Sequence, residues 1–264
     1  MLKKVMNILL WILLLGGVIG LTGFAETERN HTLCKQIDVK IMQNDSAFFI
    51  TPAEIRALIS AQQGEVTKKS LDKIDVKAME DMLNSNAYID NAQVFATPDG
   101  VLHVSVAQKK PMVRVISAGN ESYYLDTKGN LMPLSPDFTA LVMVVNGKIK
   151  EPYARFSKNN MEAMQGDTSV HSLLPSIYKL SGFIYHNPVW KALIPEIYVD
   201  SAQEFCLIPR VGNQRIIFGD STNMQQKFAR LWVLYRDGFG YAGKWNDYSQ
   251  INLKYNHQIV CTKK

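Results

Sequence analysis

Five histidines are the side chains best suited to bind a metal or to transfer protons near neutral pH, so their spacing decides what chemistry to expect. They lie at positions 31, 103, 171, 186 and 257. None of them forms an HxH or HxxxH pair, and no acidic residue is placed with two of them as a third ligand. The sequence contains no GxSxG motif and no cysteine in a recognisable catalytic context. We therefore expect no catalytic residue, no metal site and no cofactor.

A glycine-rich stretch at residues 238–244 matches the GxxxxGK pattern of phosphate-binding loops. Trp245 follows it, where that motif needs Ser or Thr to hold magnesium. The motif also requires a strand before the loop and a helix after it, whereas the pattern here predicts a helix before and a strand after. We interpret residues 238–244 as a turn.

The three cysteines, Cys34, Cys206 and Cys261, are too widely spaced for a disulfide framework or a CxxC metal site. Cys206 and Cys261 could pair if their strands were neighbours, and buried free thiols are the alternative. The chain has a net charge of +5 with scattered Lys and Arg residues. Nucleic-acid binding would need these cations to cluster, so no nucleic-acid partner is expected.

An almost unbroken apolar run covers residues 5–24 and is long enough to cross a bilayer as a helix. Lys3 and Lys4 precede it, which predicts a cytoplasmic tail at residues 1–4 and the remaining chain outside the cytoplasm. Residues 25–33 then form a tether. A cleaved signal peptide is the alternative, although its apolar region is usually shorter.

Residues 34–110 predict a compact α+β module. Residues 34–42 alternate like a half-buried strand, and Thr51, Pro52 and Glu54 predict the start of a helix that Gly64 ends. A second helix follows Asp75. Two strands at residues 91–97 and 101–108 are joined by a turn at residues 98–100. The predicted order is strand, helix, helix, strand, strand.

Residues 111–264 predict a mixed β-sheet domain with flanking helices. Its first four strands, expected as an antiparallel meander, are residues 113–116, 123–126, 131–134 and 140–145. Residues 153–170 lack periodicity and predict a loop insertion. Later elements are helices at residues 173–185 and 224–236, strands at 196–199, 204–209 and 215–218, and a last strand at 248–261. That last strand turns Ile251, Leu253, Tyr255, Ile259 and Cys261 to one face.

Four pieces in order carry a family resemblance: a short basic start with one apolar span; CKQIDVKI with FITPAEI; VLHVSVAQKKPMVRV followed by YYLDTKGNLMPLS; and RIIFGD, KFARLWVLY and YSQINLKYNHQIVC near the end. With these pieces the chain resembles the FtsQ/DivIB family of bacterial cell-division proteins. The resemblance implies a POTRA domain followed by the family's β-domain. It also implies a single-pass inner-membrane protein with its bulk in the periplasm, at the division site.

The implied function is that of a non-catalytic scaffold during septum formation. FtsB-like and FtsL-like proteins would bind by β-augmentation at the last strand, and other division proteins would contact the POTRA-like module around residues 51–59. The implied contact residues are Trp245, Tyr248, Gln250, Asn252, Lys254, Tyr255, Asn256, Gln258 and Ile259. An internal last strand, with Tyr255 and Ile259 in the core, is the structural alternative.

Two other function classes remain at this point. A POTRA-containing envelope factor for protein secretion or outer-membrane assembly would share the first module, but those proteins usually carry POTRA domains in tandem. An envelope enzyme with an unrecognised site would need clustered acids or histidines. The chain has neither a second POTRA pattern nor such a cluster in its sequence.

Overall fold

A computed structural model describes residues 6, 11, 13–17, 32–42, 49–165 and 172–264. The chain divides into two compact units between Gln108 and Lys109. The predicted tail at residues 1–4, most of the predicted span at residues 5–24 and residues 25–31 of the tether lie outside the described residues. Among the residues that are described, no helix is both long and apolar enough to cross a membrane.

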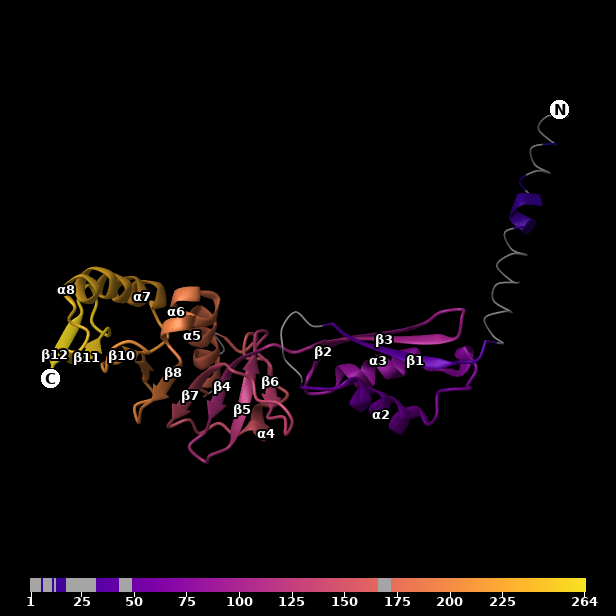
Figure 1. The fold of residues 1–264 in the computed structure, drawn as a ribbon, viewed down its shortest axis with the longest axis horizontal. Coiled ribbons are helices and arrows are strands. Elements are labelled where there is room, and N and C mark those ends of the chain that lie inside the picture. Colours follow the sequence, from indigo (N-terminus) through magenta and orange to yellow (C-terminus); the bar gives the residue numbers. More distant parts are fainter. Residues whose placement is uncertain (1–5, 7–10, 12, 18–31, 43–48, 166–171) are drawn as a thin grey trace. The chain divides into compact units, whose positions relative to one another are not determined.

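From residue 32 on, the described part of the first unit is a three-stranded sheet with two α-helices (Figure 1). Its elements are β1 (Gln36–Met42), α2 (Pro52–Gln63), the 3₁₀ turn η1 (Leu71–Lys73), α3 (Val76–Asn84), β2 (Ile89–Ala96) and β3 (Val101–Gln108). The strand order is β1-β3-β2, with β1 parallel and β2 antiparallel to β3. The predicted order of strands and helices is confirmed; only the short turn η1 was not predicted.

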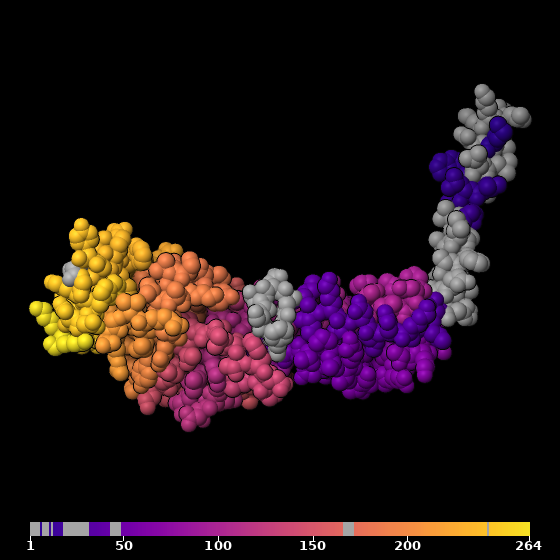
Figure 2. All heavy atoms as spheres, in the orientation of Figure 1, coloured from indigo at the N-terminus to yellow at the C-terminus, as the bar shows by residue number. Residues whose placement is uncertain are grey.

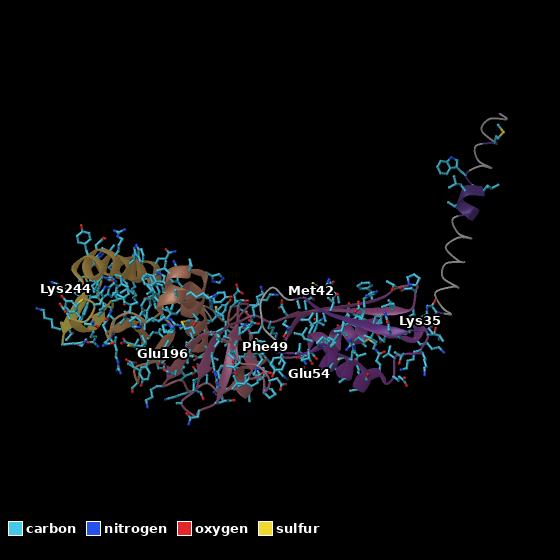
Figure 3. The ribbon with its side chains drawn as sticks, in the orientation of Figure 1. Lys35, Met42, Phe49, Glu54, Glu196 and Lys244 are labelled. Atoms are coloured by element: carbon cyan, nitrogen blue, oxygen red, sulfur yellow. The ribbon has the colours of Figure 1, made fainter. Side chains whose placement is uncertain are left out.

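Local signals explain where α2 begins and ends. The Thr51 hydroxyl accepts a hydrogen bond from the Glu54 amide at 3.2 Å, and the Glu54 carboxylate, labelled in Figure 3, accepts one from the Thr51 amide at 2.7 Å. This capping box satisfies amides that the first helical turn cannot pair. Gly64 ends the helix at a positive φ of 70°. Ile55 and Ile59 of α2 then pack into the core of this unit.

The second unit contains a sheet whose described strands run in the order β12-β11-β10-β9-β8-β7-β4-β5-β6. The strands are β4 (Pro111–Ile116), β5 (Ser122–Asp126), β6 (Leu131–Pro133), β7 (Met143–Gly147), β8 (Glu196–Val199), β9 (Phe205–Ile208), β10 (Arg215–Gly219), β11 (Tyr248–Asn252) and β12 (Val260–Lys263). Side chains from the sheet and from the helices of this unit form a single continuous core.

The predicted antiparallel meander is wrong at its fourth strand. β7 runs parallel to both β4 and β8, and it begins at Met143 rather than at residue 140. Parallel neighbours need a long crossover, and residues 148–195 supply one between β7 and β8. At Gly147 the φ angle is +109°, and an added Cβ would lie 2.2 Å from the carbonyl oxygen of Val199. Glycine therefore permits the close approach of β7 to β8.

The predicted loop insertion at residues 153–170 is partly folded. It begins with a short helix, α4 (Tyr153–Phe156), and both Phe156 and Met161 are buried in the core. The Asn160 side-chain amide donates to the Lys128 carbonyl at 2.7 Å and to the Asn130 side-chain oxygen at 2.9 Å. These contacts fix the segment to the turn between β5 and β6. Residues 166–170 of the predicted insertion lie outside the described residues.

Helices on one side of the sheet complete the unit in Figure 1. They are α5 (Leu174–His186), α6 (Pro188–Leu193), α7 (Met224–Val233), the π-helical turn η2 (Leu234–Phe239) and α8 (Gly240–Ala242). The helix α6 was not predicted. Asn187 begins it, because its side-chain oxygen accepts hydrogen bonds from the amides of Val189 and Trp190 at 3.0 and 3.1 Å.

Candidate protein-interaction edge

The predicted last strand at residues 248–261 is two strands. β11 pairs in parallel with β10 and in antiparallel with β12, and residues 253–259 form the connection between them. His257 has a positive φ of 63°, a left-handed conformation that belongs to turns rather than to strands. The prediction was wrong because polar and apolar residues keep alternating through the connection. The edge of this sheet is therefore β12, four residues long.

The predicted contact residues fall into three environments. Tyr248, Gln250 and Asn252 lie in β11. Gln250 and Asn252 pair with both β10 and β12, so their backbone is not an open edge, and Tyr248 pairs with Lys263 of β12. The exposed connection carries Lys254, Tyr255, Asn256 and Gln258. The prediction left Tyr255 open as a partner contact or as a core residue; in the structure, 50% of its surface is exposed to solvent. Ile259 and Trp245 are half-buried and pack against the core.

Aromatic contacts hold the turn before β11 against the helical end of the unit. The Trp245 ring meets Tyr235 edge-on at 5.2 Å and Phe239 at 5.6 Å, and Tyr248 stacks on Phe239 at 5.5 Å. Burial raises the pKa of Tyr235 to about 12, although its hydrogen bond with Gln214 opposes the rise. Trp245 and Tyr248 therefore fix the position of β11 against η2, which carries Tyr235 and Phe239.

Arg230 of α7 holds the connection between β11 and β12. Its guanidinium donates to the carbonyl oxygens of Leu253 at 3.0 Å and Gln258 at 2.9 Å, and also to the carbonyl oxygen of Tyr255. Three carbonyls that lie outside the sheet thus share one fork of donors. Sequence reasoning missed this residue. The only signal was a cation among apolar residues in KFARLWV, which does not reveal a partner more than twenty residues away.

A second basic residue joins the same region to the sheet. Lys254 Nζ lies 2.6 and 2.7 Å from the two carboxylate oxygens of Glu204, and this ion pair raises the pKa of the lysine. Lys254 was predicted as a partner contact. In the structure its ammonium group already pairs within the chain.

β12 presents an open side. Among the described strands, none pairs with it on the side away from β11. Its first residue, Val260, is 42% exposed, and Thr262 and Lys263 are exposed as well. The Ser249 hydroxyl donates to the Thr262 and Lys263 carbonyls at 3.2 and 3.3 Å, which fixes β12 on β11. In Figure 2 these C-terminal residues, in yellow, reach the surface of the second unit.

The remaining sheet edges are less suited to adding a strand. β6, at the other end of the large sheet, has three residues and ends in Pro133. In the first unit, β2 is partly capped by α3, whose Glu80 and Asn84 side chains accept hydrogen bonds from the Val94 and Ala92 amides at 2.7 and 2.8 Å. The other edge strand, β1, exposes charged residues such as Lys40, which disfavour strand addition.

Cys206 and Cys261 do not pair. Cys206 lies in β9 and Cys261 in β12, with β10 and β11 between them. At about 4.8 Å per strand they are roughly 14 Å apart, and a disulfide needs Cα atoms within about 7 Å. Both thiols are free, and burial raises the pKa of each.

Comparison with protein families follows the same division of the chain. A family model described as "FtsQ/DivIB, C-terminal related" matches residues 110–262, more than half of the sequence. The chain belongs to the FtsQ/DivIB family. A POTRA-like domain model matches residues 32–107 of this FtsQ/DivIB protein, which corresponds to its first unit. No curated protein matches the chain.

Proposed function

We propose that this FtsQ/DivIB-family chain is a non-catalytic scaffold of the bacterial cell-division machinery that links proteins during septum formation. The family match over residues 110–262 supports this role. A POTRA-like module alone would suit a division scaffold or a factor for secretion or outer-membrane assembly. The match of the second unit to the FtsQ/DivIB family favours the division scaffold. Residues 5–24 anchor the chain in the inner membrane, with residues 1–4 in the cytoplasm and both folded units in the periplasm.

The scaffold binds an FtsB-like or FtsL-like partner by β-augmentation at β12. The open side of β12 carries this proposal, because an added strand gains backbone hydrogen bonds there without displacing any strand that the structure describes. This placement moves the contact from the residues first expected, 248–259, to Val260–Lys263. The POTRA-like unit contacts further division proteins around α2.

A capture experiment with the full chain in lipid nanodiscs tests this placement. Val260→Asp puts a charge on the exposed edge strand and should reduce capture of a purified FtsB-like partner by roughly tenfold or more. Tyr255→Lys is the matched control, since Tyr255 is also about half exposed but lies in the connection. Circular dichroism establishes that both variants fold.

Equal capture by Val260→Asp and the unmodified chain would refute the β12 contact. Loss of capture with Tyr255→Lys but not with Val260→Asp would show that the partner binds the connection between β11 and β12 instead of β12. Failure of the unmodified chain to capture any FtsB-like or FtsL-like protein would refute the scaffold function itself.

A further inference from the structure

Helices α5, α6 and α7 enclose an apolar groove of about 340 Å³ within the second unit. It is lined by Phe183, Asn187, Val189, Trp190, Gln225, Phe228, Ala229 and Trp232. Only two of these side chains are polar, and the Asn187 oxygen already caps α6. The groove is therefore a site for an apolar group. None of its residues belongs to β11, β12 or their connection, so the inference does not rest on the proposed function.

Packed aromatic rings form the inner wall of the groove. Phe183 stacks on Phe228 with ring centres 4.7 Å apart, and Trp190 lies 4.9 Å from Phe228. Trp190 also meets Trp232 edge-on at 6.2 Å. Phe228 and Trp190 are buried, whereas Trp232 and Val189 are exposed at the rim. A fixed inner wall and an exposed apolar rim suit an inserted side chain, because few groups must be ordered on binding.

The groove follows one face of α7. Gln225, Phe228, Ala229 and Trp232 recur at spacings of three and four residues, so they form a stripe along the helix. Seven residues at about 1.5 Å each give a stripe roughly 10 Å long, about two helical turns. A stripe of this length facing a second helix, α6, is the geometry that receives an amphipathic helix.

The charge around the groove is positive. Helices α5, α6 and α7 contain Lys179, Lys191, Lys227 and Arg230 but no Asp or Glu. Lys227 is held by Asp220, and Arg230 by the connection before β12. Lys191 follows the groove residue Trp190 directly; it is exposed, and its ammonium lies over the Tyr185 ring at 4.1 Å. In the part of the chain that the structure describes, no carboxylate forms an ion pair with it.

We propose that this groove binds an amphipathic helix of a partner protein, with large apolar side chains on one face and carboxylates beside them. The apolar side chains enter between α6 and α7, and a carboxylate pairs with Lys191. A membrane surface is the poorer match, because insertion into lipid requires apolar side chains that protrude, whereas this site is concave. The absence of acidic residues from the three helices selects against basic partners.

Photo-crosslinking of the full chain in living cells tests the proposal. A benzophenone amino acid replaces Ala229, which lines the groove, or Ala202, the matched control, which is also exposed but lies in the turn between β8 and β9 and not in the groove. Crosslinked segments are sequenced by mass spectrometry. We expect a crosslink from position 229, and not from position 202, to an apolar helical segment that contains Asp or Glu.

A charge reversal completes the test. Lys191→Glu should reduce the crosslink from position 229 by roughly tenfold, whereas Lys148→Glu, an exposed lysine that follows β7 and is not part of the groove, should leave it unchanged. A crosslink to lipid, to a second copy of this chain or to a segment without carboxylates would overturn the proposal. So would equal crosslinking at both positions, no crosslink at all, or a crosslink that Lys191→Glu does not change.

Discussion

Arg230 donates hydrogen bonds to backbone carbonyls of the connection between β11 and β12, as the amides of a neighbouring strand would. Three backbone carbonyls of residues 253–258 lie outside the sheet, and the guanidinium of Arg230 satisfies them together. Leu253 is buried, so its carbonyl would cost free energy of folding if it were left unpaired. The position of β12 therefore depends on one side chain of α7 as well as on its pairing with β11.

Arg230→Lys retains the positive charge but removes the planar fork of donors. We expect the free energy of unfolding to fall by about 1–2 kcal/mol, because one ammonium cannot reach three carbonyls at once. Amide hydrogen exchange should become faster in residues 253–263 and stay unchanged in β4 and β5. Arg236→Lys is the control, since Arg236 pairs with its exposed neighbour Asp237. Equal effects of the two substitutions would contradict this role of Arg230.

Lys227 of α7 forms an ion pair with Asp220, which precedes the helix. The lysine side chain is only 7% exposed, and its ammonium lies 2.9 Å from a carboxylate oxygen of Asp220. The hydrogen bond from the Thr222 hydroxyl, together with the Lys227 ammonium, lowers the pKa of Asp220 from 3.8 to about 2, against the opposing effect of burial. A carboxyl group with a lowered pKa stabilises the fold above its ordinary pKa.

This shift predicts a pH dependence of stability. The contribution of Asp220 should be complete above about pH 4 and should disappear as the pH falls toward 2. Asp220→Asn should lower the free energy of unfolding at pH 7 by about 1 kcal/mol, since solvent screens a carboxylate that is 67% exposed. Urea titrations between pH 2 and 7 measure the difference. A gap between variant and unmodified protein that stays constant with pH would contradict the pairing.

At the scale of elements, the segment between β7 and α5 is fixed by a buried glutamate. The carboxylate of Glu151 accepts hydrogen bonds from the Leu173 amide at 2.6 Å and from the Lys150 amide at 2.9 Å. Its carbonyl accepts one from the Tyr123 hydroxyl at 2.8 Å. Burial, followed by the charge of Glu151, raises the pKa of Tyr123. One residue thus joins the start of α5 to the sheet.

Removing this carboxylate should loosen the segment without unfolding the sheet. We expect Glu151→Ala to cost about 1–3 kcal/mol, because the part-buried amides of Lys150 and Leu173 lose their acceptor. Limited proteolysis should then cleave within residues 153–165 faster than in the unmodified chain. Glu162→Ala, an exposed change within the same segment, should leave the cleavage rate unchanged. Equal cleavage of the Glu151 and Glu162 variants would show that the glutamate does not fix the segment.

Elements with local signals could be predicted from the sequence, and pairings between distant residues could not. Thr51 and Glu54 predict α2 because the capping residues lie three apart. The division of the last strand was missed because the alternation of side chains continues past Asn252. The structural cause of that division is the left-handed backbone of His257 together with Arg230, which lies more than twenty residues earlier in the chain. The parallel register of β7 likewise depends on β8, about fifty residues later.

At the scale of the whole molecule, the two units have separate hydrophobic cores. The family match to residues 110–262 and the POTRA-like match to residues 32–107 follow the same division. Each unit therefore offers its own surface to a partner. Binding at β12 should leave the first unit unchanged, which gives an internal control within a single molecule.

Hydrogen exchange tests the central claim of an open edge at β12 most directly. The full chain in nanodiscs is compared with and without a purified FtsB-like partner, and exchange is read along the backbone by mass spectrometry. New protection should appear in residues 260–263 and be absent from β1, β2 and β3, because only the edge strand gains backbone hydrogen bonds. Protection confined to residues 253–259 or to the first unit, or no protection at saturating partner, would contradict the account.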